Sequence, residues 1–290
     1  MRKPEPIFNI CADHGEGPVW DPLKRQLYWV DIMVGKYYKA DYPSGKIEEH
    51  SIGQELGVLA LREKGGIVMG VRDGFGFYEE ETKVFSLLED SPEKNNGKVR
   101  FNDGAVDPAG RFFAGTMEWE GNEDIGTLYL LDTDHGHRVM EENIFITNGM
   151  GWSPDKKKYY MTDTFRNVIY VYDYDLSTGN ISNRKNHITF DFNVYPDGMT
   201  IDSDGGFWVA IWGGAKIVRF DASGKKMEEI TLPVLHPTSC CFGGDDMKTL
   251  FITTSQHPLS EAQRKEYPLA GRMFAMATNT RGMVEPRYRG

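Results

Sequence analysis

The amino-acid sequence predicts an all-β protein, a six-bladed β-propeller with a metal site in its central channel. Three observations indicate this fold: a module recurs about every 40 to 50 residues, no long stretch has a helical period, and oxygen-bearing side chains fill one column of the repeat. With 290 residues and 40% hydrophobic content, the chain can bury a large core without disulfides. All-β folds of this length often form one domain, so we expect residues 1–290 to be a single propeller domain.

The repeated module is a glycine, a hydrophobic step, a turn of the Asp-Pro or Ser-Pro type, and then an aromatic or β-branched strand. Its clearest copies are GPVWDP before LYWVDI, GMGWSP before YYMTDT and GMTIDS before FWVAIW. Aligning all copies gives six anchor positions: Gly17, Gly57, Asp103, Gly149, Gly198 and Cys240. Units of this length with several short strands are typical of propeller blades, whereas two separate β domains would explain the even period less well.

Further strands are expected between the anchors, where alternating runs such as VIYVYDYD end at polar turns such as DLSTGN. The runs IFNICA near the start and RMFAMAT near the end are predicted to complete one shared blade and close the ring. Closure of that kind removes free sheet edges. The segment EAQRKEY, near residue 265, is the best candidate for a short helix.

The residues immediately before the anchors define a candidate site. They are Glu16, Leu56, Asn102, Asn148, Asp197 and Ser239. Equivalent positions at the start of the inner strands should converge on the propeller axis, where unpartnered carboxylates are costly and a cation relieves the cost. Oxygen ligands suit a hard divalent ion, and a small ligand set leaves positions for water or substrate. Ordinary turn chemistry is the alternative for Asn or Asp before Gly, but it does not explain Glu16 or the recurrence.

Two further sets of polar residues have repeat positions of their own. Arg100 lies two residues before Asn102, so both side chains should face the channel, where Arg100 could bind substrate oxygens or pair with a carboxylate. Asp31 and Asp163 share a position on the second strand, and we interpret them as structural hydrogen-bond acceptors between blades. No Ser, Cys or His arrangement indicates a covalent nucleophile, and the His and Trp residues are assigned to core or rim.

Charge and composition restrict the partners. The net charge is −10 with scattered acidic residues, which argues against a nucleic-acid partner because phosphate binding needs a clustered basic face. No apolar run is long enough to cross a membrane and the N-terminus lacks a signal pattern, so we expect a soluble cytoplasmic protein. Cys11, Cys240 and Cys241 fit neither a disulfide framework nor a zinc site, and we expect all three to be buried.

Five segments together resemble the regucalcin/gluconolactonase family, also called the senescence marker protein family. They are GEGPVWDP (15–22), RFNDGAVDPAGRFFAGTM (100–117), TNGMGWSPD (147–155), YPDGMTIDSDG (195–205) and TSCCFGGDD (238–246). They follow in order along nearly the whole chain, and AIWGG with YPLAG is especially similar to bacterial sugar-acid lactonases. The resemblance implies a six-bladed propeller that hydrolyses an aldonolactone with one divalent ion, which could be Ca, Zn, Mn, Mg or Fe(II).

The resemblance also implies roles for individual residues. It assigns Glu16, Asn148 and Asp197 to the metal and Arg100 with Asn102 to the substrate. It places an acidic substrate contact after the GTM segment, where Glu120 is the best match and Glu118 is the alternative.

The resulting hypothesis is metal-assisted lactone hydrolysis with Asp197 as the catalytic proton acceptor. Another ester or organophosphate hydrolase on the same scaffold, or a non-enzymatic calcium-binding propeller, remains as an alternative. The sequence specifies neither the sugar nor the oligomeric state.

Overall fold

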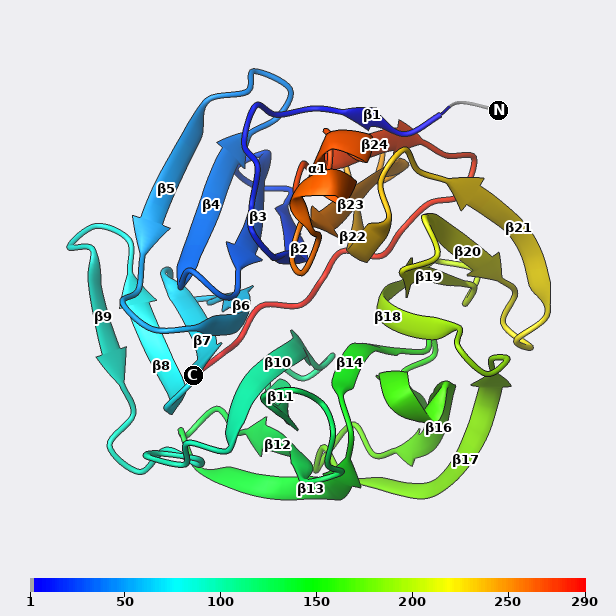
Figure 1. Cartoon of the computed structure of the whole chain (residues 1–290). Helices are drawn as coiled ribbons and strands as arrows, with labels where there is room; N and C mark the ends of the chain where they lie inside the picture. The colour runs from blue at the N-terminus through cyan, green and yellow to red at the C-terminus, as the bar shows by residue number, and fades with distance from the viewer. Residues whose placement is uncertain (1–2) are drawn as a thin grey trace.

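The computed structural model describes residues 3–290, which form six four-stranded antiparallel sheets arranged as blades around an axis (Figure 1). Blade 1 is β2 (Gly15–Asp21), β3 (Gln26–Asp31), β4 (Lys36–Asp41) and β5 (Ile47–Ser51). Blade 2 is β6 (Leu56–Leu61), β7 (Ile67–Val71), β8 (Gly74–Glu79) and β9 (Val84–Leu87). Blade 3 is β10 (Val99–Val106), β11 (Phe112–Glu118), β12 (Gly126–Leu131) and β13 (His137–Ile144). Blade 4 is β14 (Thr147–Trp152), β15 (Lys158–Asp163), β16 (Val168–Tyr174) and β17 (Ile181–Thr189); blade 5 is β18 (Tyr195–Ile201), β19 (Phe207–Trp212), β20 (Lys216–Phe220) and β21 (Lys226–Thr231). The predicted six-bladed propeller is confirmed.

Blade 6 closes the ring with strands from both ends of the chain. Its order is β22 (His236–Gly243), β23 (Thr249–Ser255), β24 (Phe274–Ala277) and then β1 (Glu5–Pro6). The shared blade and the RMFAMAT strand are therefore confirmed, but the placement of the closing strand over IFNICA is wrong. That segment leaves the ladder because Phe8 stacks on Trp29 and Ala12 packs into the core between blades 6 and 1.

Apolar side chains fill the space between neighbouring blades. Strands β6, β7 and β12 are buried at every position, since both faces of their sheets are covered. One cluster joins Tyr28 and Val30 of blade 1 to Leu59 and Met69 of blade 2. The outermost strands, such as β9, alternate between exposed and half-buried positions. This packing holds the innermost strands in register around the axis.

The six predicted anchors all lie on the innermost strands, and each of these strands has a β-bulge at the candidate column. The shifts fall between Glu16/Val19, Leu56/Val58, Phe101/Asp103, Asn148/Met150, Pro196/Met199 and Pro237/Ser239. A bulge turns a side chain away from the regular ladder. The anchor glycines allow the inner strands to approach: a Cβ on Gly57 would lie 2.3 Å from the Phe101 carbonyl oxygen, and one on Gly149 would lie 2.6 Å from the Met199 amide nitrogen.

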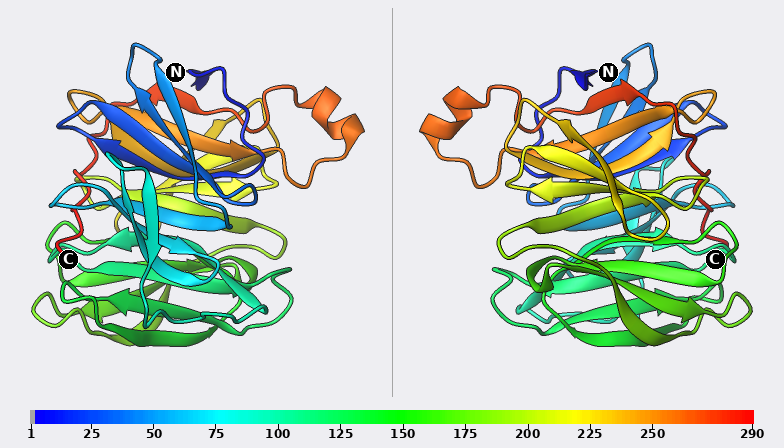
Figure 2. Two further views of the ribbon diagram at one scale, coloured as in Figure 1. Left: turned by 90° about the vertical axis from the view of Figure 1, so that its left-hand side faces the viewer. Right: turned by 90° about the vertical axis from the view of Figure 1, so that its right-hand side faces the viewer.

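The two faces of the ring carry different segments (Figure 2). The helix α1 (Glu261–Glu266), which confirms the predicted short helix, projects from one face, called the α1 face below. The C-terminal residues 281–290 cross the opposite face, where the Tyr288 amide donates to the Leu61 carbonyl at 2.9 Å and Arg287 pairs with Asp21 at 2.6 Å. The innermost strands begin at the α1 face, so the candidate column lies on that side.

Asp31 and Asp163 hold the segments that enter blades 1 and 4. Asp31 accepts hydrogen bonds from the amides of Asp13 and His14 at 2.8 and 2.9 Å, and Asp163 accepts from the Arg166 side chain at 2.6 Å. Both residues are structural acceptors, but they bind the connections that enter their blades and, for Asp163, Arg166 of the same blade, so the predicted placement between blades is wrong.

The cysteines follow the prediction only in part. Cys240 and Cys241 are buried free thiols, but Cys11 is exposed, because it lies on the segment that crosses from blade 6 to blade 1. Within residues 3–290, no helix has the length and apolar character needed to span a membrane.

The close approach of the inner strands is testable at Gly57. We expect Gly57→Ala to lower the free energy of unfolding by about 1 to 3 kcal/mol, because the added methyl group overlaps the Phe101 carbonyl. Gly97→Ala is the matched control, since a Cβ there meets no described atom within 4 Å, and it should change stability by less than about 0.5 kcal/mol. Urea denaturation measures the stability of both variants. A Gly57→Ala variant as stable as Gly97→Ala would show that the strands carrying Gly57 and Phe101 do not approach this closely.

Candidate metal and substrate site

Four polar residues of the column are brought together where the inner strands begin. Glu16 lies on β2, Asn102 on β10, Asn148 on β14 and Asp197 on β18, and each is at most 8% exposed. Asn102 links two blades, because its amide nitrogen donates to the Thr147 carbonyl at 2.9 Å, next to Asn148. Leu56 and Ser239 complete the column as buried residues. The bulges thus direct side chains from four separate blades toward one place.

The carboxylates of this cluster are buried close to one another. Burial, followed by the charges of Asp197 and Asp103, raises the pKa of Glu16 well above its ordinary value. Burial and then Asp103 raise the pKa of Asp197 in the same way. Asp103, which the sequence alignment treated only as an anchor, belongs to the cluster, and burial raises its pKa to about 7. The shifts show that three ionised carboxylates in this space are costly, and a bound cation would offset that cost.

The donor atoms fit a hard divalent ion. The Asn148 side chain donates to Thr164 Oγ1 at 3.1 Å, while its buried Oδ1 has no hydrogen-bond partner in residues 3–290. An amide oxygen beside two carboxylates is the ligand type that such ions prefer. The described residues contain no cluster of three or more His, Cys, Asp or Glu side chains able to hold a metal, and this set differs in using an amide as its third donor.

Arg100 is a buried cation beside the cluster. Its Nη1 donates to Asn102 Oδ1 at 2.7 Å and to the Phe101 carbonyl at 3.2 Å, and its Nε is unpaired within the described chain. Burial lowers the pKa of Arg100 to about 10, although Glu16, Glu55 and Asp197 oppose the shift. The guanidinium therefore stays charged near neutral pH, with only neutral acceptors bonded to it in residues 3–290.

Glu118 and Glu120 have different surroundings at the α1 face. Glu118 ends β11, and its Oε2 accepts from the amides of Glu120 and Asn122, both at 3.0 Å. Its carboxylate therefore shapes the following loop. Glu120 lies in that loop with an exposed side chain.

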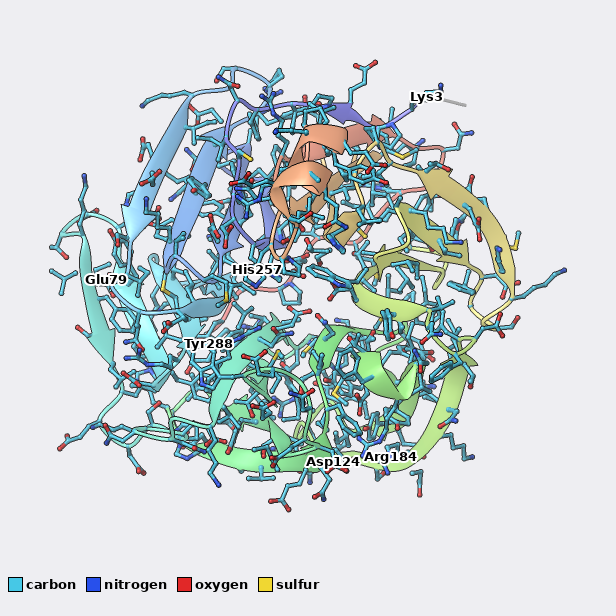
Figure 3. All side chains as sticks on the ribbon, viewed as in Figure 1. Lys3, Glu79, Asp124, Arg184, His257 and Tyr288 are labelled. Carbon is cyan, nitrogen blue, oxygen red and sulfur yellow. The ribbon has the colours of Figure 1, made fainter. Side chains whose placement is uncertain are left out.

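Sequence reasoning missed an aromatic group beside the cluster, because it assigned the His and Trp residues to core or rim. His14 stacks on Trp212 at 5.4 Å between ring centroids, and Trp212 stacks on His236 at 4.2 Å. His257 lies 5.9 Å from His14, and Figure 3 shows it near the middle of the ring. The signal for His14 was its position two residues before Glu16, which gives it the same facing.

The buried imidazoles of this group are neutral near pH 7. Burial, then the charge of Arg100, lowers the pKa of His14 to about 3. Burial and then His257 lower the pKa of His236 to about 4.

The fold and the site together define the class of this protein: it is a six-bladed propeller in which acid and amide side chains gather where the inner strands begin. Residues 14–256 match the family model described as "SMP-30/Gluconolactonase/LRE-like region", and the chain belongs to this family. The chain is 34% identical to 6-deoxy-6-sulfogluconolactonase of Pseudomonas putida over 278 residues, covering 95% of each protein. It is 36% identical to regucalcin of Sus scrofa over 298 residues, covering 99% of each. Among solved structures, it resembles the calcium-binding protein regucalcin of Agrobacterium tumefaciens strain C58, with a TM-score of 0.93, 25% identity and coverage of 97% and 95%.

The buried charge of Glu16 has a consequence for stability. Because its folded pKa is raised, Glu16 destabilises the fold increasingly as the pH rises above the ordinary value of 4.5, and the effect vanishes below that value. Glu16→Gln should therefore raise the free energy of unfolding at pH 8, in chelator, because it removes a buried carboxylate whose folded pKa is raised.

The gain should shrink as the pH is lowered toward 4.5. Glu81→Gln, at an exposed position, serves as the control and should leave stability nearly unchanged. Urea denaturation across this pH range measures both variants. A Glu16→Gln variant no more stable than the parent at pH 8 would contradict the strain assigned to the cluster.

Proposed function

We propose that this protein hydrolyses a sugar lactone to the corresponding aldonic acid in a metal-dependent reaction at the candidate site. The observation that carries the proposal is the convergence of Glu16, Asp197 and the unpaired Asn148 Oδ1 beside the Arg100 guanidinium. Names among the relatives support the reaction class, since one is a 6-deoxy-6-sulfogluconolactonase. The family description also names gluconolactonase.

Glu16, Asn148 and Asp197 would hold the ion. A bound divalent ion supplies a Lewis acid that polarises the lactone carbonyl. The oxygen-only donor set accommodates Ca, Zn, Mn, Mg or Fe(II), and the regucalcin relative described as calcium-binding favours an ion of this kind.

Asp197 is the proposed catalytic base. Its carboxylate accepts a proton from the attacking water and later delivers that proton to the ring oxygen as the ester bond breaks. The position of Asp197 favours this role, because its buried side chain lies in the cluster beside the groups proposed to hold the ion.

Arg100 and Asn102 are proposed to hold the sugar hydroxyls. Arg100 has donors left for substrate, including the buried Nε, whereas both polar groups of Asn102 already bond within the protein. Asn102 therefore acts mainly by fixing the guanidinium, with the second lone pair of Oδ1 left for a hydroxyl. Such orientation lowers the barrier by placing the carbonyl for attack.

The reaction is tested with metal-stripped protein and a panel of aldonolactones in a pH-stat assay. Acid release should be absent in chelator and return when a divalent ion is added. Asp197→Ala should lower kcat by at least about 100-fold, the usual contribution of a general base. Asn186→Ala, at an exposed position, is the control for folding and should retain full activity.

Other outcomes separate the alternatives. Hydrolysis of phosphotriesters or simple esters, but of no lactone, would favour a different hydrolase. Metal binding without hydrolysis of any substrate would indicate a calcium-binding propeller. Near-normal turnover by Asp197→Ala would contradict its catalytic role.

Glu118 at the end of β11 and Glu120 in the loop that follows give a separate prediction. Glu120→Gln should raise KM for the lactone severalfold with little change in thermal stability, because its exposed side chain is the proposed substrate contact. Glu118→Gln should lower the melting temperature instead, because its carboxylate holds the loop amides. Steady-state kinetics and thermal denaturation of both variants distinguish these effects, and the reverse pattern would make Glu118 the contact.

A further inference from the structure

Four aromatic side chains from three adjacent blades line the α1 face beside the candidate site. His14 precedes β2, Trp212 ends β19, His236 begins β22, and His257 lies on the connection from β23 to α1. Their rings stack or meet at 4.2 to 5.9 Å, and we call these four residues the histidine wall. The His257 amide donates to the Asp13 carbonyl at 3.0 Å, which anchors this connection to the residue before His14.

The wall adjoins the reacting centre. His14 lies two residues before Glu16 and faces the same way. Trp212 pairs with Tyr195 on β18, two residues before Asp197. Arg100 comes from β10 of blade 3, across the axis from blade 6, and its Nη1 donates to Asn102, which holds in blade 3 the position that Glu16 holds in blade 1. A ligand bound at the cluster would therefore extend toward the wall.

Three nitrogen atoms around this space are buried without a partner in the described part of the chain: His14 Nδ1, His236 Nδ1 and Arg100 Nε. Unsatisfied buried polar groups are costly, and His14 and His236 both stack on Trp212, so a ligand on this wall would satisfy both. The part of the chain that the structure describes, the wall included, has no group of three or more His, Cys, Asp or Glu side chains able to hold a metal ion.

The character of the wall indicates what this ligand is. Arg100 can only donate hydrogen bonds, and an imidazole offers an N–H to an acceptor in either protonation state. Among the charged groups near the wall, Asp13 is engaged with His257 Nδ1 at 3.4 Å, Glu16 belongs to the proposed metal cluster, and Arg100 has an unpaired Nε within the described chain. A group that only accepts hydrogen bonds and carries negative charge matches these donors better than a hydroxyl, which must also donate.

We propose that the histidine wall, together with the Nε of Arg100, forms a subsite for an oxyanion at the end of the substrate remote from the lactone carbonyl, while the Nη groups of Arg100 hold the sugar hydroxyls. The oxyanion is a carboxylate, sulfonate or phosphate on the sugar. The inference rests on the proposed lactonase function and narrows its substrate class to acidic sugar lactones.

The test compares lactones that differ only in this terminal group. Metal-loaded protein is assayed with glucono-lactone and with its 6-phospho, 6-deoxy-6-sulfo and 6-carboxylate counterparts, one arm for each source of charge. We expect kcat/KM for at least one anionic lactone to exceed that for glucono-lactone by roughly tenfold, as one or two charged hydrogen bonds would provide. A parent enzyme that favours the neutral lactone over all three overturns the proposal.

Variants show which residues produce the preference for anionic over neutral lactones. His236→Gln and His14→Asn should each reduce the anionic-to-neutral ratio roughly tenfold, mainly through KM, whereas a structural role would lower both activities together. His137→Asn, on the outermost strand of blade 3, is the matched control and should keep the parental ratio. A preference that persists in both wall variants overturns the proposal, because the anion would then bind elsewhere, for example at the metal.

A binding measurement separates this inference from the proposed function. Calorimetry with 6-phosphogluconate, 6-deoxy-6-sulfogluconate, glucarate and gluconate on the metal-loaded protein requires no hydrolysis. Tighter binding of an anionic acid that is lost in His236→Gln supports the subsite even if no lactone is hydrolysed. Lactone hydrolysis with equal binding of all four acids would leave the proposed function intact and refute the subsite.

Discussion

The close approach of six strands to one axis is the constraint on which the rest of this structure depends. At Gly57, Gly149 and Gly198, the backbone or side chain of the next blade occupies the space where a Cβ would stand. Strands packed this closely leave room for the column side chains only if the ladder is interrupted, and each inner strand has a bulge there. The glycine lets the neighbouring strands pack closely, and the bulge turns the preceding side chain toward the axis. Both features are needed at the same point of the inner strand.

The same geometry explains the electrostatic cost of the site. Residues directed at one axis from separate blades cannot avoid one another, so Glu16, Asp103 and Asp197 share a buried space. A fold selected for stability alone would place apolar side chains there, as blade 2 does with Leu56. The apolar contacts between blades offset this cost, because they are distributed around the whole ring and do not depend on the axial residues.

The features that could be predicted from sequence are those encoded locally. Each anchor combines turn chemistry with a strand pattern, so the inner strands and the column could be found by alignment alone. The closing strand could not be placed correctly, because its pairing of Glu5 with Ala275 depends on contacts between opposite ends of the chain. The exposure of Cys11 was missed for the same reason. The roles of Glu16, Asn148 and Asp197 as ligands stay a prediction.

The histidine wall could not be predicted from local turn chemistry or strand patterns. Its members come from two strand ends, the residue before a strand and an irregular connection, and they share no repeat position. The six-fold repeat can generate the acid and amide cluster, since that cluster uses one position per blade. A repeated position cannot by itself distinguish one substrate from another, because recognition of an asymmetric sugar needs different groups on different sides. Asymmetry therefore enters where the repeat is broken, at the closing blade, whose β23–β24 connection carries His257 and α1. In the proposed function the repeated half of the site performs the chemistry, and in the proposed subsite the irregular half selects the substrate.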